Sequence, residues 1–334
     1  MSGELRVGIA GISGYGGGEL LRLCAGHPAF RVVYAAGEST AGQRLAQRFP
    51  ALAGLEAGEL EIQSFEPDAA SSLDVLFASL PTGKSREPLA RVAKRVRVVD
   101  VGGDHRFVAG WTYGLSELPG QRAEIRACTR LANPGCYPAA ALLALAPLLK
   151  AGLIESDGIV IDAKSGVTGT GRGGASDYGY AETNEDVFAY GLASHPHLPE
   201  IEAALAQVAG RMVSAAFTAH LVPMNRGILA TCYARPRGDA SAARALAAAR
   251  ELYANEPFVR VRELENGRGP HTGWATGTNL CFVGYAQNAR TGHLIALGAI
   301  DNLGKGAAGQ AVQNANLMTG QPETAGLLGL PTFP

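Results

Sequence analysis

Cys136 is the residue with the clearest chemical potential, because it stands in the run Leu131–Pro138 directly before an apolar helical pattern that begins at Ala139. A thiol at a helix N-terminus lies at the positive end of the helix dipole, beside backbone N–H donors that can hold an anion. Both effects favour the thiolate, which is the nucleophilic form of cysteine. Pro134 and Gly135 form a turn that can present the side chain. We therefore predict a nucleophile; the alternative is a small buried apolar residue, as most free cysteines are.

Two histidines form a second chemical segment, His195-Pro196-His197-Leu198-Pro199-Glu200-Ile201. The two prolines predict an extended or turning backbone whose imidazoles point in different directions, with a helix beginning at Pro199 and Glu200 in its first turn. A histidine near a nucleophilic cysteine can act as a general acid or base. The ligand spacing of a metal site is not evident, so no metal is expected. The alternative is one surface histidine and one structural histidine.

Three arginines, Arg106, Arg172 and Arg226, stand in irregular segments. Guanidinium groups bind carboxylate and phosphate, although a solvated arginine is the ordinary alternative. Arg106 follows a predicted strand, and the carboxyl ends of parallel strands face the ligand crevice of an open α/β sheet. The three are therefore candidates for binding an anionic substrate.

A glycine loop, GxxGxxG over Gly8–Gly14, follows the first predicted strand and opens the first predicted helix. Glycines at this turn let a pyrophosphate reach the helix N-terminus. The predicted dinucleotide contacts are Gly11, Ile12, Ser13, Gly14 and Tyr15. After the second strand, Glu38 suits the ribose of NAD, whereas Ser39 and Arg44 suit the 2′-phosphate of NADP. We favour NADP.

The elements that must position these residues fall into two halves. The length of 334 residues predicts two domains, and the net charge of −1 gives no global attraction for nucleic acid or anionic lipid. Five widely spaced cysteines indicate no disulfide framework, the longest apolar run is too short to span a bilayer, and the N-terminus does not resemble a signal peptide. These features predict a cytoplasmic protein.

In the first half, strands alternate with helices, which predicts a parallel sheet covered on both faces. The expected strands are Leu5–Ala10, Arg31–Ala36, Leu73–Leu80, Val96–Val101 and Cys128–Ala132, with helices at Tyr15–Ala25 and Gly83–Lys94. The second half predicts an α+β domain with a mixed or antiparallel sheet. Its expected strands are Ile159–Ala163, Ala215–Val222, Ile228–Ala234, Phe258–Arg262, Asn279–Gly284 and Leu294–Ile300, with helices at Pro199–Ala209 and Ala240–Ala254. Cys24, Cys232 and Cys281 are expected in the core, and the glycine-rich segment Lys164–Tyr180 indicates a functional loop or a mobile one.

Several motifs together resemble the N-acetyl-γ-glutamyl-phosphate reductase family, within the wider group of aspartate-semialdehyde and glyceraldehyde-phosphate dehydrogenases. The resemblance runs almost end to end. It rests on Gly8–Leu20, Tyr113–Leu118, Asn133–Pro138, Ser165–Arg172, His195–Ile201, Val222–Gly227 and Asp301–Asn314.

The resemblance implies a Rossmann-type α/β cofactor domain, residues 1–134 and 302–334, and an α+β substrate and oligomerisation domain, residues 135–301, of the glyceraldehyde-phosphate-dehydrogenase type. It implies NADP(H), a Cys136 nucleophile and a histidine acid/base, for which we favour His197 over His195 because it is closer to Glu200. It places Ser79, Pro81 and Asn314 at the cofactor, and Arg106, Ser165, Arg172, Glu200 and Arg226 at the substrate. Two positions depart from the family pattern, with Pro196 in place of an arginine and His105 in place of a phenylalanine.

The implied reaction is reductive dephosphorylation of N-acetyl-γ-glutamyl phosphate in arginine biosynthesis, by a homodimer or homotetramer. Two enzyme alternatives stay open: the reductase that acts on an aminoadipyl phosphate in lysine biosynthesis, and aspartate-semialdehyde dehydrogenase. A nucleotide-sensing interaction protein is the alternative outside catalysis.

Overall fold

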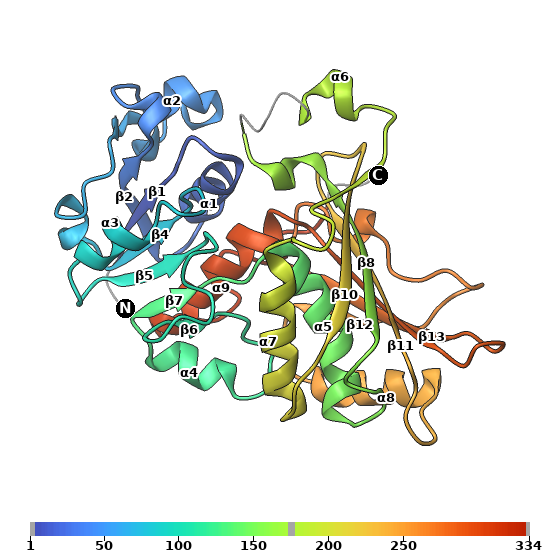
Figure 1. Cartoon of the computed structure of the whole chain (residues 1–334). Coiled ribbons are helices and arrows are strands. Elements are labelled where there is room, and N and C mark those ends of the chain that lie inside the picture. Colours follow the sequence, from blue (N-terminus) through green and yellow to red (C-terminus); the bar gives the residue numbers. More distant parts are fainter. Residues whose placement is uncertain (1–3, 173–177, 332–334) are drawn as a thin grey trace. The chain divides into compact units, whose positions relative to one another are not determined.

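The computed structural model describes residues 4–172 and 178–331, which form two compact units (Figure 1). Unit 1 comprises the residues up to Ser116, Gly120–Pro134 and Ala307–Leu328. Unit 2 comprises Glu117–Pro119, Gly135–Gly306 and the residues from Gly329 onward.

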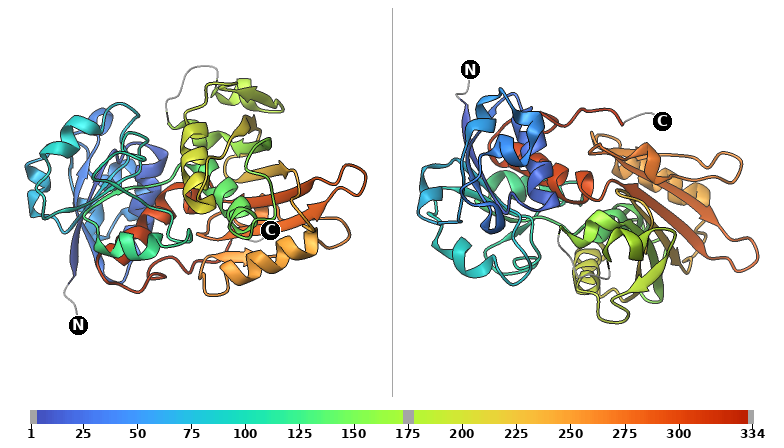
Figure 2. Two further views of the ribbon diagram at one scale, coloured as in Figure 1. Left: turned by 60° about the horizontal axis from the view of Figure 1, so that its bottom comes forward. Right: turned by 90° about the horizontal axis from the view of Figure 1, so that it is seen from above.

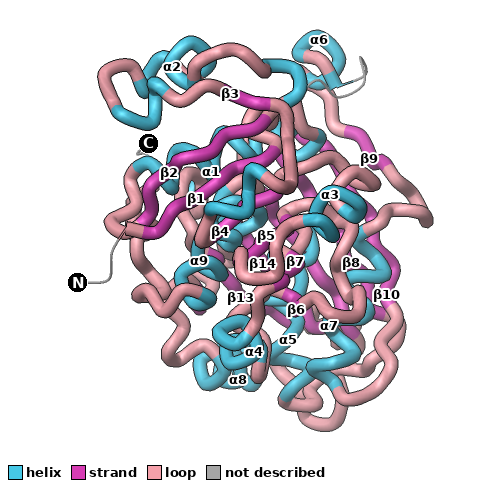
Figure 3. Tube along the Cα trace, turned by 90° about the vertical axis from the view of Figure 1, so that its left-hand side faces the viewer, coloured by secondary structure: helices cyan, strands magenta, loops and turns pink. Residues whose placement is uncertain are grey.

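Unit 1 contains a seven-stranded sheet in which every pair of neighbouring strands is parallel. The strands, in spatial order, are β3 (Ile62–Gln63), β2 (Phe30–Ala36), β1 (Leu5–Ala10), β4 (Val75–Ala78), β5 (Arg97–Asp100), β7 (Arg130–Ala132) and β6 (Thr112–Tyr113). Figure 3 shows β1 and β2 side by side. Strand β4 is buried along its whole length, as expected for a parallel strand covered on both faces.

The α-helices in the described part of unit 1 are α1 (Tyr15–Ala25), α2 (Leu45–Arg48), α3 (Arg86–Arg91), α4 (Gln121–Ala127) and α9 (Gly309–Met318). All ten residues of α9 are buried. One of its buried polar side chains pairs across the unit, since Asn316 Oδ1 lies 2.9 Å from His27 Nε2. The C-terminal helix is therefore part of the core of the first unit.

Unit 2 contains a mixed seven-stranded sheet. Its strands, in spatial order, are β12 (Val259–Val261), β13 (Cys281–Gln287), β14 (Leu294–Ile300), β11 (Ile228–Ala234), β8 (Ile159–Gly166), β10 (Ala215–Val222) and β9 (Phe188–Tyr190). The helices are α5 (Cys136–Lys150), α6 (Tyr180–Thr183), α7 (His197–Ala209) and α8 (Ala242–Leu252). Figure 2 shows α8 along the sheet beside β13, and α5 packs against α7.

Helix α5 contains an internal proline, and tyrosine hydroxyls donate hydrogen bonds to carbonyls of the turn that precedes it. Pro147 lacks the N–H that would bond to the carbonyl of Leu143. The buried Tyr253 hydroxyl instead donates to that carbonyl at 2.8 Å. Tyr285 donates to the next carbonyl, that of Ala144, at 3.1 Å. The helix that carries Cys136 therefore continues unbroken into the core.

The predicted architecture is confirmed: a parallel α/β unit and a mixed-sheet unit. Cys24, Cys232 and Cys281 are buried, as expected. The predicted helix over residues 83–94 was too long, since α3 covers only Arg86–Arg91, and the short strands β3, β6 and β9 were not predicted. Such short strands carry too little periodicity to be recognised.

Candidate active site

Cys136 is the first residue of α5, three residues before the start predicted from the apolar run. Pro138 is the third residue of the helix, where a missing N–H costs no intrahelical bond. Gly135 precedes Cys136 and is the N-cap of the helix, with extended backbone at φ −70° and ψ 157°. The thiol is therefore partly accessible and located at the positive end of a helix of 15 residues.

Glu200 connects this helix end to a second one. Its Oε1 accepts the backbone N–H of Gly135 at 2.8 Å, and the residue is 5% exposed. Glu200 lies in the first turn of α7, which begins at His197. The N-termini of α5 and α7 therefore meet, and each helix has a chemically competent residue, Cys136 and His197, in its first position (Figure 1).

The predicted geometry of the two histidines was wrong. The helix begins at His197 rather than at Pro199, because Pro196 serves as its N-cap with φ −64° and ψ −15°. The ring centroids of His195 and His197 are only 4.8 Å apart. Both rings meet the Tyr137 ring edge-on, at centroid distances of 5.7 and 5.9 Å.

Aromatic rings surround His195, and its tautomer is fixed by one hydrogen bond. The rings of Tyr137, Tyr190 and Phe217 all lie within 5.7 Å of its own ring centroid. Burial lowers the pKa of His195 from its ordinary value. Nδ1 accepts the backbone N–H of His197 at 3.2 Å, so the neutral ring has its proton on Nε2. This imidazole is neutral at physiological pH.

Tyr137 and Tyr190 were not among the residues predicted for the site, although Tyr137 stands in the cysteine motif. The Tyr190 hydroxyl donates to the Tyr137 oxygen at 3.1 Å, and the Tyr137 hydroxyl donates to the carbonyl of His220 at 3.0 Å. Burial raises the pKa of both phenols, so both remain protonated. The two tyrosines are hydrogen-bonded to each other and pack against the histidine rings.

Arg226 is held by the carboxylate of Asp301. Its Nε and Nη2 donate to Asp301 at 2.9 and 3.1 Å, and Asp301 is fully buried. Next to it, Asn302 accepts the N–H of Gly227 at 2.8 Å and donates to Thr168 Oγ1 at 2.9 Å. The dipeptide Asp301-Asn302, which follows β14, therefore ties together the two segments that contain Arg226 and Thr168.

The other predicted substrate residues of unit 2 lie on β8 and the loop after it. Ser165 is buried, and its hydroxyl donates to the carbonyl of Gly166 at 3.0 Å. The same side chain also hydrogen-bonds the Tyr137 phenol, so Ser165 lies beside the residue that follows Cys136. Arg172 is exposed. Of the predicted loop over residues 164–180, residues 173–177 lie outside the described part of the chain.

In unit 1, the glycine loop, the second strand and Ser79 come together. Gly11 has φ +85°, and a Cβ there would lie 2.0 Å from the carbonyl oxygen of Ser79. The Ser13 hydroxyl lies 2.6 Å from that of Thr40. The backbone N–H groups of Gly11 and Ile12 both donate to the carbonyl of Ala36, at 2.8 and 2.9 Å. The carboxyl ends of β1, β2 and β4 therefore form one closely packed rim in front of α1.

The residues weighed for cofactor choice are exposed beside this rim. Glu38 Oε1 accepts the N–H of Phe65 at 3.1 Å, so this carboxylate already has a backbone partner. The Arg44 guanidinium pairs with Glu59, and both side chains are 61% exposed. Ser39 is exposed in the same turn, and Pro81 is exposed after β4.

Asn314 joins α9 to the strand that leads to the cysteine motif. Its Nδ2 donates to the carbonyl of Gly114 at 2.7 Å and to Asn133 Oδ1 at 3.0 Å. Arg106 Nε donates to the carbonyl of Asn133 at 3.0 Å. Within unit 1, Arg106, Asn133 and Asn314 thus form one cluster at the carboxyl ends of β5 and β7.

The departure at His105 has a structural explanation. Its ring stacks on Trp111 at a centroid distance of 3.8 Å, and Nδ1 lies 2.6 Å from Asp100 Oδ2. Asp104 beside it accepts three hydrogen bonds from Gly83 and Ser85. Burial alone would raise the pKa of Asp104, but these hydrogen bonds outweigh it and the pKa is lowered. The polar ring is therefore accommodated, and Arg106 keeps its position.

Comparison with known proteins supports the same division of the chain. Residues 6–127 match the semialdehyde dehydrogenase NAD binding domain, and residues 136–302 match the semialdehyde dehydrogenase dimerisation domain. An aspartate-semialdehyde dehydrogenase from Vibrio cholerae, complexed with ASA, has a TM-score of 0.75 at 18% identity and covers 95% of this chain and 99% of its own. A probable aspartate-semialdehyde dehydrogenase from Pseudomonas aeruginosa has a TM-score of 0.75 at 19% identity, covering 95% and 98%. Fold and site thus define a protein of the semialdehyde dehydrogenase class.

Sequence relatives narrow this class. The N-acetyl-γ-glutamyl-phosphate reductase of Bradyrhizobium sp. strain BTAi1 is 58% identical over 99% of this chain and 100% of its own length. The protein of that name from Methylobacterium sp. strain 4-46 is 57% identical with the same coverage. The chain belongs to the N-acetyl-γ-glutamyl-phosphate reductase family. In the described residues, no helix is long and apolar enough to cross a membrane.

Proposed function

We propose that the protein is an NADPH-dependent reductase that converts N-acetyl-γ-glutamyl phosphate into N-acetylglutamate semialdehyde and inorganic phosphate, in arginine biosynthesis. The observation that carries this proposal is the meeting of two helix N-termini at Cys136 and His197, through Glu200. The reducing cytoplasm is the compartment in which an accessible thiol stays free.

Cys136 opens the reaction as the nucleophile. Its thiolate attacks the acyl carbon, the carbon–oxygen bond to phosphate breaks, and inorganic phosphate leaves with the bonding electrons. The product of this step is a thioester on Sγ. The dipole of α5 favours the thiolate before attack, and N–H groups of its first turn are the donors for the oxyanion that forms during attack.

When bound, NADPH supplies the hydride that reduces the thioester carbonyl to the thiohemiacetal level. The residues that would hold it are Gly11–Tyr15, Ser39, Arg44, Ser79, Pro81 and Asn314. The fit is supported by the crowded backbone at Gly11 and the open space at Gly14, where a Cβ would meet nothing nearer than 3.6 Å. Because no neighbouring atom fills the space beside Gly14, a phosphate group can approach the backbone there.

His197 handles the proton. It donates to the alkoxide as hydride arrives and takes the proton back when the thiohemiacetal collapses to aldehyde and thiolate. His195 is less suited to this exchange, because its ring is enclosed by aromatic rings and burial lowers its pKa. We assign His195 to the support of His197, through the hydrogen bond from the His197 backbone.

Arg106, Arg172 and Arg226 supply positive charge for the phosphate and the α-carboxylate, with Ser165 as a hydroxyl donor. The bidentate pairing of Arg226 with the buried Asp301 fixes the plane of its guanidinium. Glu200 contributes by holding the Gly135 backbone rather than by touching substrate.

The proposed function is tested by running the reaction backwards. Purified protein is mixed with NADP, phosphate and either N-acetylglutamate semialdehyde or aspartate semialdehyde, and NADPH formation is followed by absorbance. We expect phosphate-dependent formation of NADPH with N-acetylglutamate semialdehyde and none with aspartate semialdehyde. NADPH formation only with aspartate semialdehyde would reassign the substrate. Binding of NADP without turnover of either semialdehyde would contradict the proposal.

We further propose that two copies associate through the sheet face of unit 2 that α5, α7 and α8 leave uncovered. Val160 and Tyr233 are cross-strand partners on this face and are 43% and 38% exposed. Beside them, Asp162 Oδ1 lies 2.9 Å from Lys164 Nζ and 3.1 Å from His220 Nδ1. An apolar pair next to a charge-balanced cluster suits a self-complementary interface.

Sedimentation equilibrium of wild type and Tyr233→Asp tests this interface. The wild type is expected as a dimer or larger, and the variant at lower mass, because the substitution places a carboxylate at the centre of a desolvated contact. A monomeric wild type, or a variant of unchanged mass, would contradict the proposed interface.

A further inference from the structure

The segment between β14 and α9 contains a fully buried ion pair that the reaction above does not use. Lys305 lies in a π-helical turn, Gly304–Ala308, and its Nζ lies 2.5 Å from Oε1 of Glu117. Both side chains have no exposed surface. Burying two charges costs free energy that their attraction only partly returns, so such a pair is poorly explained as a source of stability.

The glycines on either side of Lys305 press the turn against two other backbones. A Cβ on Gly304 would lie 2.1 Å from the carbonyl oxygen of Thr278. A Cβ on Gly306 would lie 2.8 Å from the Cβ of Cys136 and 3.2 Å from its Cα. Gly306 also donates its N–H to the carbonyl of Asp301 at 2.9 Å. The turn therefore contacts the nucleophile's own backbone, and Lys305 is the side chain between the two points of contact.

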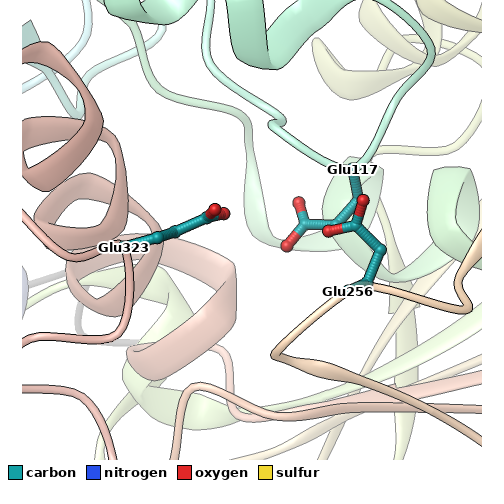
Figure 4. A group of neighbouring side chains, drawn as sticks. All are labelled: Glu117, Glu256 and Glu323. Carbon is teal, nitrogen blue, oxygen red and sulfur yellow. The ribbon is translucent and has the colours of Figure 1, made fainter.

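The surroundings of Lys305 hold its ammonium group in one place. Its Nζ lies 5.6 Å from the ring centroid of Phe258. One carboxylate oxygen of Glu117 and one of Glu256, both in unit 2, lie within 4.8 Å of each other. Figure 4 draws these two side chains; Glu323, also drawn there, belongs to unit 1. Burial raises the pKa of nearby Cys281 to about 12, so that thiol is neutral. The ammonium group balances the buried carboxylate of Glu117.

We infer that Lys305 is a positioning residue for Cys136: its buried pairing with Glu117 anchors the π-turn and so holds Gly306 against the cysteine. This inference rests on the proposed function, since it requires Cys136 to be the nucleophile. π-Turns within helical segments are frequent at functional sites. A nucleophile displaced by about 1 Å can lose on the order of a hundredfold in rate, so a fixed backing matters for catalysis.

The test compares Lys305→Met with the double variant Lys305→Met/Glu117→Met. The single change leaves a buried carboxylate without its cation, so both Tm and kcat should fall. The double change removes that unpaired charge, so Tm should recover while kcat stays lower by about ten- to a hundredfold. The KM for the semialdehyde should change less than threefold in the double variant, because neither residue is assigned to the substrate.

Further variants keep the inference testable if Lys305→Met does not fold. Gly306→Ala should lower kcat with little change in NADP affinity, since the atoms nearest to its Cβ belong to Cys136 and Asp301. Lys150→Met, an exposed lysine at the other end of α5, removes the same charge and should keep wild-type kcat. A double variant whose kcat recovers with its Tm, or a fully active Gly306→Ala, would overturn the inference. An inactive wild type would instead contradict the proposed function.

Discussion

The carboxylate of Glu200 accepts the backbone N–H of Gly135 at 2.8 Å, and so joins the first turn of α7 to the residue that caps α5. This hydrogen bond aligns the N-termini of the two helices, which begin at Cys136 and His197. We therefore expect the Glu200 side chain to set the spacing of Cys136 and His197, the two residues proposed to react.

Replacing Glu200 tests this alignment. Glu200→Ala leaves the N–H of Gly135 buried without its acceptor, which should cost about 1–3 kcal/mol of stability and lower kcat. Glu200→Gln keeps an acceptor oxygen of the same reach and is the matched control. Thermal melts and steady-state kinetics of both variants give the answer. Equal behaviour of the alanine and glutamine variants would show that the hydrogen bond does not align the site.

Cys136→Ser should bind NADP as the wild type does and lose turnover by at least about a thousandfold, as expected when a covalent nucleophile is removed. The residues proposed to bind the cofactor lie in unit 1, whereas Cys136 is in unit 2, so cofactor binding and turnover are expected to separate. Cofactor titration by fluorescence and the reverse assay measure them. Cys128→Ser is the control thiol, since Cys128 ends α4 in unit 1. Full activity of Cys136→Ser would exclude the thioester route.

The lowered pKa of His195 predicts a pH dependence of stability. The unfolded chain binds a proton at this ring below about pH 6.5, whereas the folded chain binds it only at lower pH. Stability is therefore present above that ordinary value and is lost as the pH falls through the folded pKa. His195→Asn keeps an acceptor for the His197 N–H but cannot titrate. Between pH 7 and 5, Tm of the wild type should fall more steeply than Tm of the variant; parallel curves would contradict the assignment.

Arg44 should decide the choice between NADPH and NADH. Its pairing with Glu59 is exposed, so breaking it costs little stability. Arg44→Ala should raise the KM for NADPH about tenfold or more and leave that for NADH nearly unchanged, because only NADPH has the 2′-phosphate. Glu59→Gln removes the partner but keeps the guanidinium and should retain NADPH affinity. An equal effect of Arg44→Ala on both cofactors would place the 2′-phosphate elsewhere.

Gly14 separates a cofactor effect from a packing effect. A Cβ there meets nothing nearer than the Gly11 carbonyl oxygen at 3.6 Å, whereas a Cβ at Gly11 would lie 2.0 Å from the Ser79 oxygen. Gly14→Ala should keep Tm but lose about tenfold or more in NADP affinity, since the methyl group occupies the phosphate's place. Gly11→Ala should lose both. Unchanged affinity in Gly14→Ala would remove this glycine from the cofactor site.

Features encoded by contiguous residues could be predicted from the sequence, whereas contacts between distant residues could not. The glycine loop and the cysteine motif are contiguous, and their strand–turn–helix context is readable along the chain, so Gly11 and Cys136 were placed correctly at helix entrances. The start of α7 was mispredicted because Pro196 suits both an extended segment and a helix N-cap, and only packing decides between them. The Lys305–Glu117 pair joins residues 188 positions apart, and no periodicity announces such a contact.

Helix α9 has a consequence for the order in which the molecule is made. All ten of its residues are buried, and Asn314 bonds to Gly114 and Asn133, so the first unit lacks part of its core until translation has passed Met318. The second unit's continuous stretch, Gly135–Gly306, leaves the ribosome earlier. The half of the chain synthesised first therefore gains its last core helix only after the continuous stretch of the second unit has been made, which departs from the usual N-to-C order of maturation. A C-terminal truncation will damage the nucleotide-binding half, far from the cut in sequence.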